Sequence, residues 1–290
     1  APPDTNADVR IPPELIRAHD GKYLIRVAEP LEEVAYVDQL YLTVYDHPTE
    51  WDIYPDERFA TADPMPTGEP YAVAHPIFPQ AVTDHLGHDV LERLMKVDRK
   101  YVQPPVDPRF IGYAEDHWVE LDFGDRLEQL APDARLVLYL HGWVEYTFSH
   151  VNYAASQAGL SMQSPSIEVP EGNGRWKTVV KDAGYPAGLP RMMTLDVTDV
   201  PIRDQGRMRI RTNMEIFWDQ IFLAVDVGGT SGHKPKPQHR VAEGNVPTNR
   251  SDEAAAGTRI VAHRLMPTVA ELRVLGYPRE YSPDGNDPTV

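Results

Sequence analysis

Proline is the feature of this sequence that most constrains its fold. The 290 residues include 28 prolines and only 19 glycines. Proline has no backbone N–H and disrupts both helix interiors and the hydrogen-bonded ladders of central strands. Such a composition is typical of short strands joined by long surface loops. We therefore expect an all-β fold of one or two jelly-roll or β-sandwich units, with one or two short helices.

Apolar patterning locates the expected strands. Residues 117–123 alternate between polar and apolar, which predicts a strand with one buried face. The strand expected at 135–140 has a continuous apolar run after Arg135, which predicts burial on both faces. The turn sequence at 170–174 predicts a hairpin. By similar criteria we expect further strands over residues 22–27, 34–45, 71–75, 166–169, 175–180, 194–197, 207–212, 216–227, 259–263 and 271–275.

Two segments have the apolar spacing of helices. Residues 86–97 place apolar side chains at helical intervals, with charged residues on the other face, and predict a helix. Residues 152–158 predict a second, shorter helix that ends at Gly159.

Proline and glycine content also suggests how the chain is divided. We expect a β-rich unit with Pro-rich loops and one helix over residues 1–107, with a linker at 102–108. A jelly-roll-like sandwich should follow over 108–227, and an extended loop with C-terminal strands over 228–290. The sequence of residues 37–44 is similar to that of residues 218–225, which indicates either two related sandwich units or chance similarity between apolar strands.

Charge and cysteine content exclude several classes of function. The chain has 44 acidic and 28 basic residues, a formal charge of −16 that repels phosphate backbones, so nucleic acid is not an expected partner. No apolar run is long enough to predict a membrane span. The absence of cysteine excludes disulfides, thiolate catalysis and thiolate metal sites. Both ends have the character of cuts in a longer or processed polypeptide.

Motifs for catalysis and cofactor binding are missing from the sequence. There is no Gly-x-Ser-x-Gly elbow, phosphate-binding loop, His-Glu-x-x-His pair or EF-hand loop. His85 and His88 could share a face but supply only two of the ligands that zinc needs. We predict no cofactor. Calcium remains possible because oxygen ligands leave weak marks in a sequence, and the turns at Asp226 and Asp284 are candidates.

Aromatic and polar residues at strand ends are the best candidates for a binding site. Aromatic side chains follow the buried strand at 135–140, and a mixture of aromatic, amide and acidic groups spans 211–219. The candidate ligand-binding residues are His141, Trp143, Tyr146, Asn213, Glu215, Trp218 and Asp219. The alternative is that Trp143, Trp176 and Trp218 simply pack in the core or at strand rims.

Several strings in this order resemble one family of bacterial proteins. They are residues 20–27, 36–40, 44–48, 116–121, 141–143 and 184–188, and the string Arg-Thr-Asn-Met-Glu-Ile-Phe-Trp-Asp within 209–219. Over most of residues 12–280 the chain is similar to the region C-terminal to the β-propeller in FG-GAP/ASPIC-UnbV repeat proteins, the group that resembles cartilage acidic protein. The resemblance implies an exported module without an assigned activity. It carries over no catalytic residue, and the calcium-binding FG-GAP loops are absent.

These observations lead to one functional hypothesis and two alternatives. We expect an extracellular or periplasmic, non-catalytic binding or assembly module that engages a protein partner, other domains of the same polypeptide or a glycan. The first alternative is a hydrolase that acts on polysaccharide through paired carboxylates. The second is a structural subunit of an extracellular or envelope redox assembly, although no Cys-x-x-Cys-His haem attachment site is present.

Overall fold

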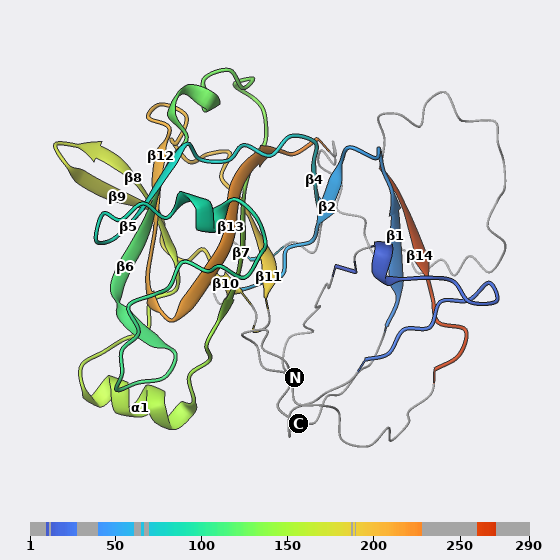
Figure 1. Cartoon of the computed structure of the whole chain (residues 1–290), viewed down its shortest axis with the longest axis horizontal. Helices are drawn as coiled ribbons and strands as arrows, with labels where there is room; N and C mark the ends of the chain where they lie inside the picture. The colour runs from blue at the N-terminus through green and yellow to red at the C-terminus, as the bar shows by residue number, and fades with distance from the viewer. Residues whose placement is uncertain are drawn as a thin grey trace.

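The body of the protein is a sandwich of two antiparallel β-sheets (Figure 1). The computed structural model describes residues 10–11, 13–27, 40–60, 65–66, 70–186, 188, 190–227 and 260–270. One sheet has five strands in the order β5-β6-β12-β8-β9, namely Ala81–Asp84, Tyr113–Asp122, Arg207–Met214, Ser166–Gly172 and Arg175–Val180. The other has three in the order β11-β7-β13, namely Arg191–Asp196, Leu136–Val144 and Ile216–Val225. The predicted all-β class is confirmed.

Smaller elements surround the sandwich. Three two-stranded ladders join β1 with β14, β2 with β4 and β3 with β10. Their bounds are Leu42–Asp46, Val261–Leu265, Asp52–Tyr54, Tyr71–Val73, Arg58–Phe59 and Tyr185–Pro186, in that order. The described helices are α1 (Ser149–Gln157) and the 3₁₀ turns η1 (Pro13–Leu15), η2 (Leu91–Leu94) and η3 (Gly124–Leu127). None of these helices is long and apolar enough to cross a membrane.

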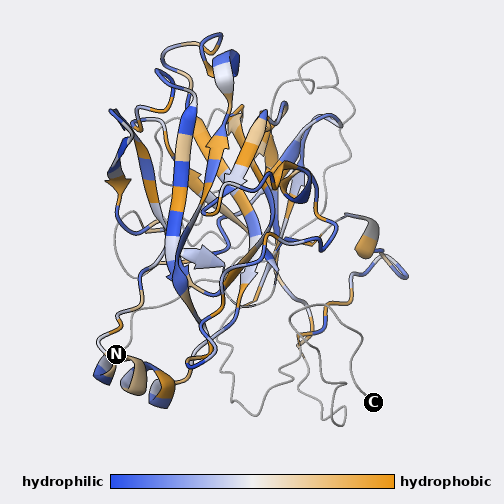
Figure 2. Cartoon of the chain, turned by 60° about the vertical axis from the view of Figure 1, so that its left-hand side comes forward, coloured by the Kyte–Doolittle hydropathy of each residue, from blue (hydrophilic) through white to orange (hydrophobic). Residues whose placement is uncertain are grey.

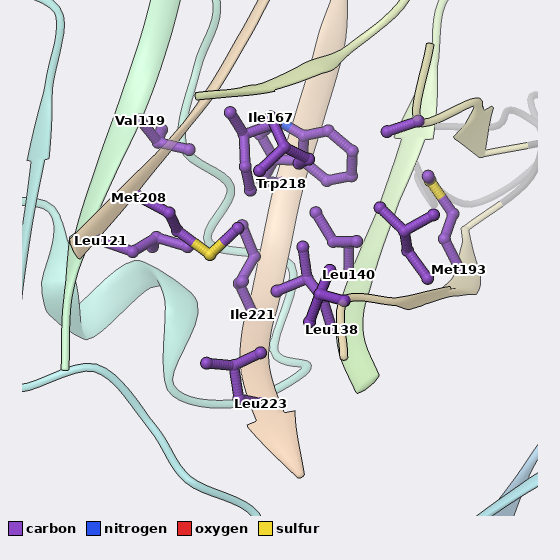
Figure 3. Close-up of a cluster of buried hydrophobic side chains, with 14 of the residues drawn as sticks. Val119, Leu121, Leu138, Leu140, Ile167, Met193, Met208, Trp218, Ile221 and Leu223 are labelled. Carbon is purple, nitrogen blue, oxygen red and sulfur yellow. The ribbon is translucent and has the colours of Figure 1, made fainter. Parts of the chain in front are cut away.

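The main hydrophobic core fills the space between the two sheets (Figure 3). Alternation along each strand creates it, and Figure 2 shows hydrophilic and hydrophobic positions following one another along the strands. In β12, Met208 and Ile210 are buried in the core, whereas Arg207, Arg209 and Arg211 lie on the outer face. The five-stranded sheet therefore has one apolar face and one polar face.

The three-stranded sheet is buried on both faces, as the apolar run of the segment 135–140 predicted for its central strand β7. Leu136, Leu138 and Leu140 belong to the main core. Val137 and Tyr139 belong to a second cluster, which also contains apolar side chains of β4, β11 and β13. There the ring of Tyr139 stacks on that of Phe222, with centroids 4.7 Å apart. Strand β7 is therefore the centre of the fold.

Three crossing segments cover the outer edge of β13. Isolated bridges pair Ile77 with Leu223, Met95 with Gln220 and Val102 with Trp218. The register of β13 against β7 shifts between Trp218 and Gln220, which leaves Asp219 as the extra residue of a β-bulge.

One strand from the N-terminal part of the chain, β5, belongs to the five-stranded sheet of the sandwich. β5 pairs with β6, so the five-stranded sheet takes strands from both sides of the domain boundary expected at residue 107. The segment 102–108 is also bonded to the sandwich. Val102 N–H donates to Trp218 O at 2.7 Å, and Asp107 N–H donates to Tyr113 O at 2.9 Å. These bonds distinguish the segment from a free linker.

The helix expected over residues 86–97 is wrong except for the single 3₁₀ turn η2. Asp84 diverts the backbone, because its Oδ1 accepts the backbone N–H groups of Leu86 and His88, both at 2.9 Å. A side chain that bonds nearby backbone groups in this way competes with helix formation. The helical spacing of apolar residues was therefore not sufficient to form a helix.

The strand expected at 22–27 is also wrong. Only a bridge between His19 and Lys22 forms there, and Leu24 and Val27 are exposed. The apolar side chains alternate, but no described strand pairs with residues 23–27. Of the segment 34–45, residues 42–45 lie in β1, residues 40–41 lie outside any strand, and residues 34–39 lie outside the described residues.

Other predicted elements agree closely with the structure. The strands expected at 71–75, 117–123, 166–169, 175–180, 194–197, 207–212 and 216–227 correspond to β4, β6, β8, β9, β11, β12 and β13. Asn173 and Gly174 have φ of 52° and 72°, which completes the predicted β8–β9 hairpin. The helix expected at 152–158 is α1, and the strand at 259–263 corresponds to β14. Residues 271–275 lie outside the described residues.

Candidate binding surface

The outer face of the five-stranded sheet carries a stack of alternating arginine and tryptophan side chains. We call this stack the arginine–tryptophan ladder and define it as Arg207, Trp176, Arg209, Trp118 and Arg211. The three arginines are alternate residues of β12, so they point the same way. Trp118 comes from β6, and Trp176 comes from β9.

Arg209 occupies the centre of the ladder. Its guanidinium carbon lies 3.9 Å from the ring centroid of Trp176 and 4.7 Å from that of Trp118. The outer guanidinium groups are more distant, with Arg207 5.7 Å from Trp176 and Arg211 5.9 Å from Trp118. These separations are within the range of cation–π interactions.

Carboxylates hold all three guanidinium groups in place. Glu120 accepts hydrogen bonds from Arg207 and from Arg209 Nε, the latter at 2.9 Å. Arg211 is bonded to Asp116, and its Nη1 lies 3.5 Å from Glu168 Oε1.

These contacts change the ionisation of the pair at the end of the ladder. The hydrogen bond from Arg211 lowers the pKa of Asp116, and the same bond raises the pKa of Arg211. Asp116, Glu120 and Glu168 thus pair with the three arginines of the ladder, so each guanidinium has at least one carboxylate partner.

The ladder is more buried at its centre than at its ends. The side chain of Arg209 is 21% exposed and that of Glu120 is 13% exposed. At the periphery, Arg207 is 46% exposed and Arg211 is 43% exposed. The face therefore presents ordered arginine and tryptophan groups to solvent.

His85 contacts Trp118 at the end of the ladder and also contacts His117, whose side chain lies on the other face of β6. The ring of His85 lies edge-on to Trp118 and to His117, with centroids 6.2 and 6.0 Å apart. His117 is buried, and its Nδ1 donates to the backbone oxygen of Glu115 at 2.8 Å. Burial lowers the pKa of His117 from 6.5 to about 4, so the ring is neutral at pH 7.

Two of the seven residues predicted to bind a ligand are fully enclosed by protein. Trp218 is 2% exposed and packs in the main core. Asp219 has no exposed surface, and its carboxylate accepts the backbone N–H groups of Asp98 at 3.2 Å and Arg99 at 3.0 Å. His141 is near it, with Nδ1 3.6 Å from Asp219 Oδ2. Asp219 thus fixes a turn beside the β13 bulge.

Of the two predicted aromatic residues at the end of β7, one is buried and the other is exposed. Trp143 is buried and stacks on Phe217, with centroids 4.4 Å apart, while Tyr101 meets both rings edge-on. Tyr146 is the exception, because 47% of its surface is exposed. Packing inside the protein therefore explains the position of Trp143, whereas Tyr146 still has a surface that a ligand could contact.

The two remaining predicted residues, Asn213 and Glu215, form hydrogen bonds with the backbone of neighbouring loops. Asn213 Oδ1 accepts the N–H of Gln163 at 2.7 Å, and its Nδ2 donates to Ser161 O at 2.8 Å. Glu215 Oε2 accepts the N–H of Gly112 at 3.1 Å, and burial raises the pKa of this carboxyl.

The seven residues therefore occupy several separate environments, and sequence reasoning did not identify the ladder. The signal was present in the alternation of Arg207, Arg209 and Arg211 with apolar residues. That alternation showed that the three arginines share a face, but not which tryptophans lie beside them.

No group of three or more histidine and acidic side chains converges on a metal-sized site within the described part of the chain. The candidate calcium turn at Asp226 has another role. Asp226 Oδ1 accepts the N–H of Ala72 at 3.1 Å, and Oδ2 lies 3.6 Å from Arg135. The turn at Asp284 lies outside the described residues.

Comparisons with known proteins do not assign the chain to a family. No protein-family model matches the sequence, and no curated protein matches it either.

Proposed function

We propose that this protein is a non-catalytic binding module that engages a protein partner through the arginine–tryptophan ladder. The observation that carries the proposal is the placement of Arg209 between Trp118 and Trp176 on the outer face of a sheet. Tryptophan and arginine are the residues most enriched among the energetic hot spots of protein interfaces. Here both types are ordered before any partner arrives, which reduces the entropy cost of binding.

The same stacking favours a protein over a glycan. Sugars bind tryptophan by lying on an open ring face. In the ladder, guanidinium groups approach the faces of both rings, and the closest, Arg209, lies 3.9 Å from the centroid of Trp176. The outer edges of the ladder still offer guanidinium N–H donors and indole edges. These groups suit the carbonyl, carboxylate and apolar groups of a protein surface.

An extracellular or periplasmic location is part of the proposal. Its support is the resemblance of residues 12–280 to exported FG-GAP/ASPIC-UnbV proteins. Fractionation of the native host, with immunodetection of the protein in the cytoplasmic, periplasmic and medium fractions, tests this part separately. Confinement to the cytoplasm would contradict it.

Site-specific photo-crosslinking in the native host tests the binding surface. A benzophenone amino acid placed at Thr178, which is exposed on β9 opposite Glu168, should capture one partner of defined mass. The control position is Tyr153, which is 67% exposed on α1. We expect the adduct at Thr178 and not at Tyr153, and we expect Arg209→Ala to abolish it.

The captured protein, identified by mass spectrometry, should then bind the purified chain. Arg209→Ala should weaken that binding by at least about tenfold, as expected for a hot-spot residue. Arg175→Ala, which removes an exposed arginine of the β8–β9 hairpin, should leave it unchanged. Equal capture at both positions, no capture, or binding of oligosaccharides that depends on Trp176 would each overturn the proposal.

A further inference from the structure

A cavity of about 700 Å³ lies beside the outer edge of β13, between the crossing segments that cover this edge. Seven of its ten lining residues are apolar. They are Pro76, Ile77, Phe78, Met95, Leu130 and the pair Val225 and Val227. His75, Arg126 and Gln129 are the polar residues of the lining. The volume is within the range typical of small-molecule sites.

Backbone hydrogen bonds and aromatic packing form the walls of the cavity. Ile77 exchanges two backbone hydrogen bonds with Leu223, at 2.6 and 3.0 Å. The ring of Phe78 packs on Phe222, with centroids 5.4 Å apart. Met95 crosses the same strand edge opposite Gln220. The walls are therefore set by the sandwich itself and do not depend on an exposed loop alone.

Arg126 is the one arginine in the lining of this cavity. Its Nη1 donates to Phe78 O at 2.6 Å, which fixes the guanidinium at the cavity. No acidic side chain among the described residues pairs with it, although the chain carries 44 acids. A guanidinium has five N–H donors, so most of them remain available to an anionic ligand. The lining thus combines an apolar surface with a single fixed cation.

We propose that this cavity binds a small molecule with an apolar body and a carboxylate, and that the carboxylate pairs with Arg126. The apolar body occupies the space between Phe78, Met95 and Leu130. The planar guanidinium suits a carboxylate because two parallel hydrogen bonds can form. The site lies apart from the arginine–tryptophan ladder and shares no residue with it.

The test uses 4-phenylbutyrate as the probe and 4-phenylbutanol as its uncharged match. Met95 in the cavity and the exposed Met266 can both be observed as ¹³C-methyl signals in NMR spectra of the full chain. Phenylbutyrate should shift the Met95 signal in a saturable manner and leave the Met266 signal unchanged. Phenylbutanol should bind about tenfold more weakly, because it lacks the charged hydrogen bond.

Variants separate the charge from the shape of the site. Arg126→Gln should weaken phenylbutyrate about tenfold and leave phenylbutanol unaffected, whereas Arg175→Gln should change neither. If Arg126→Gln unfolds the protein, a Met95→Glu and Met95→Gln pair replaces it, with binding followed on the ligand signals. The glutamate should repel phenylbutyrate more than the glutamine does. Equal affinity for the two probes, no shift at Met95, or no effect of these charge changes would overturn the proposal.

Discussion

The guanidinium of Arg209 lies 3.9 Å from the ring centroid of Trp176, and Arg209 also donates a hydrogen bond to Glu120. One side chain thus combines a cation–π interaction with an ion pair in a setting where only 21% of it is exposed. This combination makes Arg209 the most informative position for mutation on the outer face.

Arg209→Ala should lower the free energy of unfolding by about 2 kcal/mol, because it removes both interactions and leaves Glu120 with fewer partners. Arg209→Lys should restore only part of the loss, since an ammonium cannot stack as a planar group does. Urea denaturation measures both effects. Arg175→Ala is the control, because its pair with Glu171 is exposed and 3.8 Å long, and it should cost less than about 0.5 kcal/mol. Equal losses for Arg175→Ala and Arg209→Ala would contradict the ladder's role.

Asp219→Asn tests the buried carboxylate at the bulge of β13. Asp219 Oδ1 accepts the N–H groups of Asp98 and Arg99, and Oδ2 accepts that of Arg99 at 3.2 Å. The NH₂ group of an asparagine would face a backbone N–H that now donates to a carboxylate oxygen, and two donors cannot bond to each other. We therefore expect the free energy of unfolding, measured by urea denaturation, to fall by about 2–3 kcal/mol. Asp204→Asn at an exposed position should change stability by less than about 0.5 kcal/mol. A neutral Asp219→Asn would show that the turn at 98–99 does not need the carboxylate.

Two glycines with similar backbone angles should respond very differently to alanine. Gly206 and Gly174 have φ of 62° and 72°, so both substitutions strain the backbone. A Cβ at Gly206 would lie 2.1 Å from the backbone oxygen of Gly124, whereas at Gly174 no atom lies within 4 Å. Thermal unfolding should show a loss of about 1 kcal/mol for Gly174→Ala and at least about 3 kcal/mol more for Gly206→Ala. Similar losses would indicate that the contact with Gly124 relaxes easily.

His117 should make the protein less stable in acid. Its pKa is about 4 in the folded protein and 6.5 in the reference state, so below pH 6.5 the unfolded chain binds a proton that the folded chain does not. Stability should therefore fall between about pH 6.5 and pH 4, by a total on the order of 3 kcal/mol. His85 and Asp116 are the charged or titratable neighbours, and their effects on this pKa are smaller than that of burial. Urea denaturation at several pH values measures the slope.

His117→Asn provides the comparison for that slope. Asparagine can still donate to the backbone oxygen of Glu115 but does not titrate in this range. The variant should have lower stability at pH 7 and a shallower decline towards pH 4. Parallel curves for the two proteins would assign the acid sensitivity to other groups.

Local sequence patterns predicted the sandwich strands because the order of polar and apolar residues within each strand shows which of its faces are buried. The uninterrupted apolar run at 136–140 and the alternation at 207–212 each define the burial of a strand without knowledge of any other segment. The helix at 86–97 failed because Asp84, just outside the pattern, binds the following backbone. The strand at 22–27 failed because a strand also needs a partner, and apolar alternation does not supply one.

The candidate site was harder to predict than the fold for a related reason. The ladder joins residues of β6, β9 and β12, and their contact depends on strand order, which alternation does not reveal. Trp218 and Asp219 were selected for their chemical types, yet burial and backbone bonding account for both. Tyr146 remains a candidate because nearly half of its surface is exposed.

The segments that bond to β13 at Trp218, Gln220 and Leu223 have a consequence for self-association. An uncovered strand can serve as a template on which a second molecule adds its own strand, and such addition can continue into fibres. On β13, an incoming chain would first have to displace residues 77, 95 and 102. On β9, the charged side chains of Arg175 and Lys177 discourage the same event by a different means. Strand addition at these two edges is thus opposed by the segments that already occupy the edge of β13 and by the charged side chains of β9.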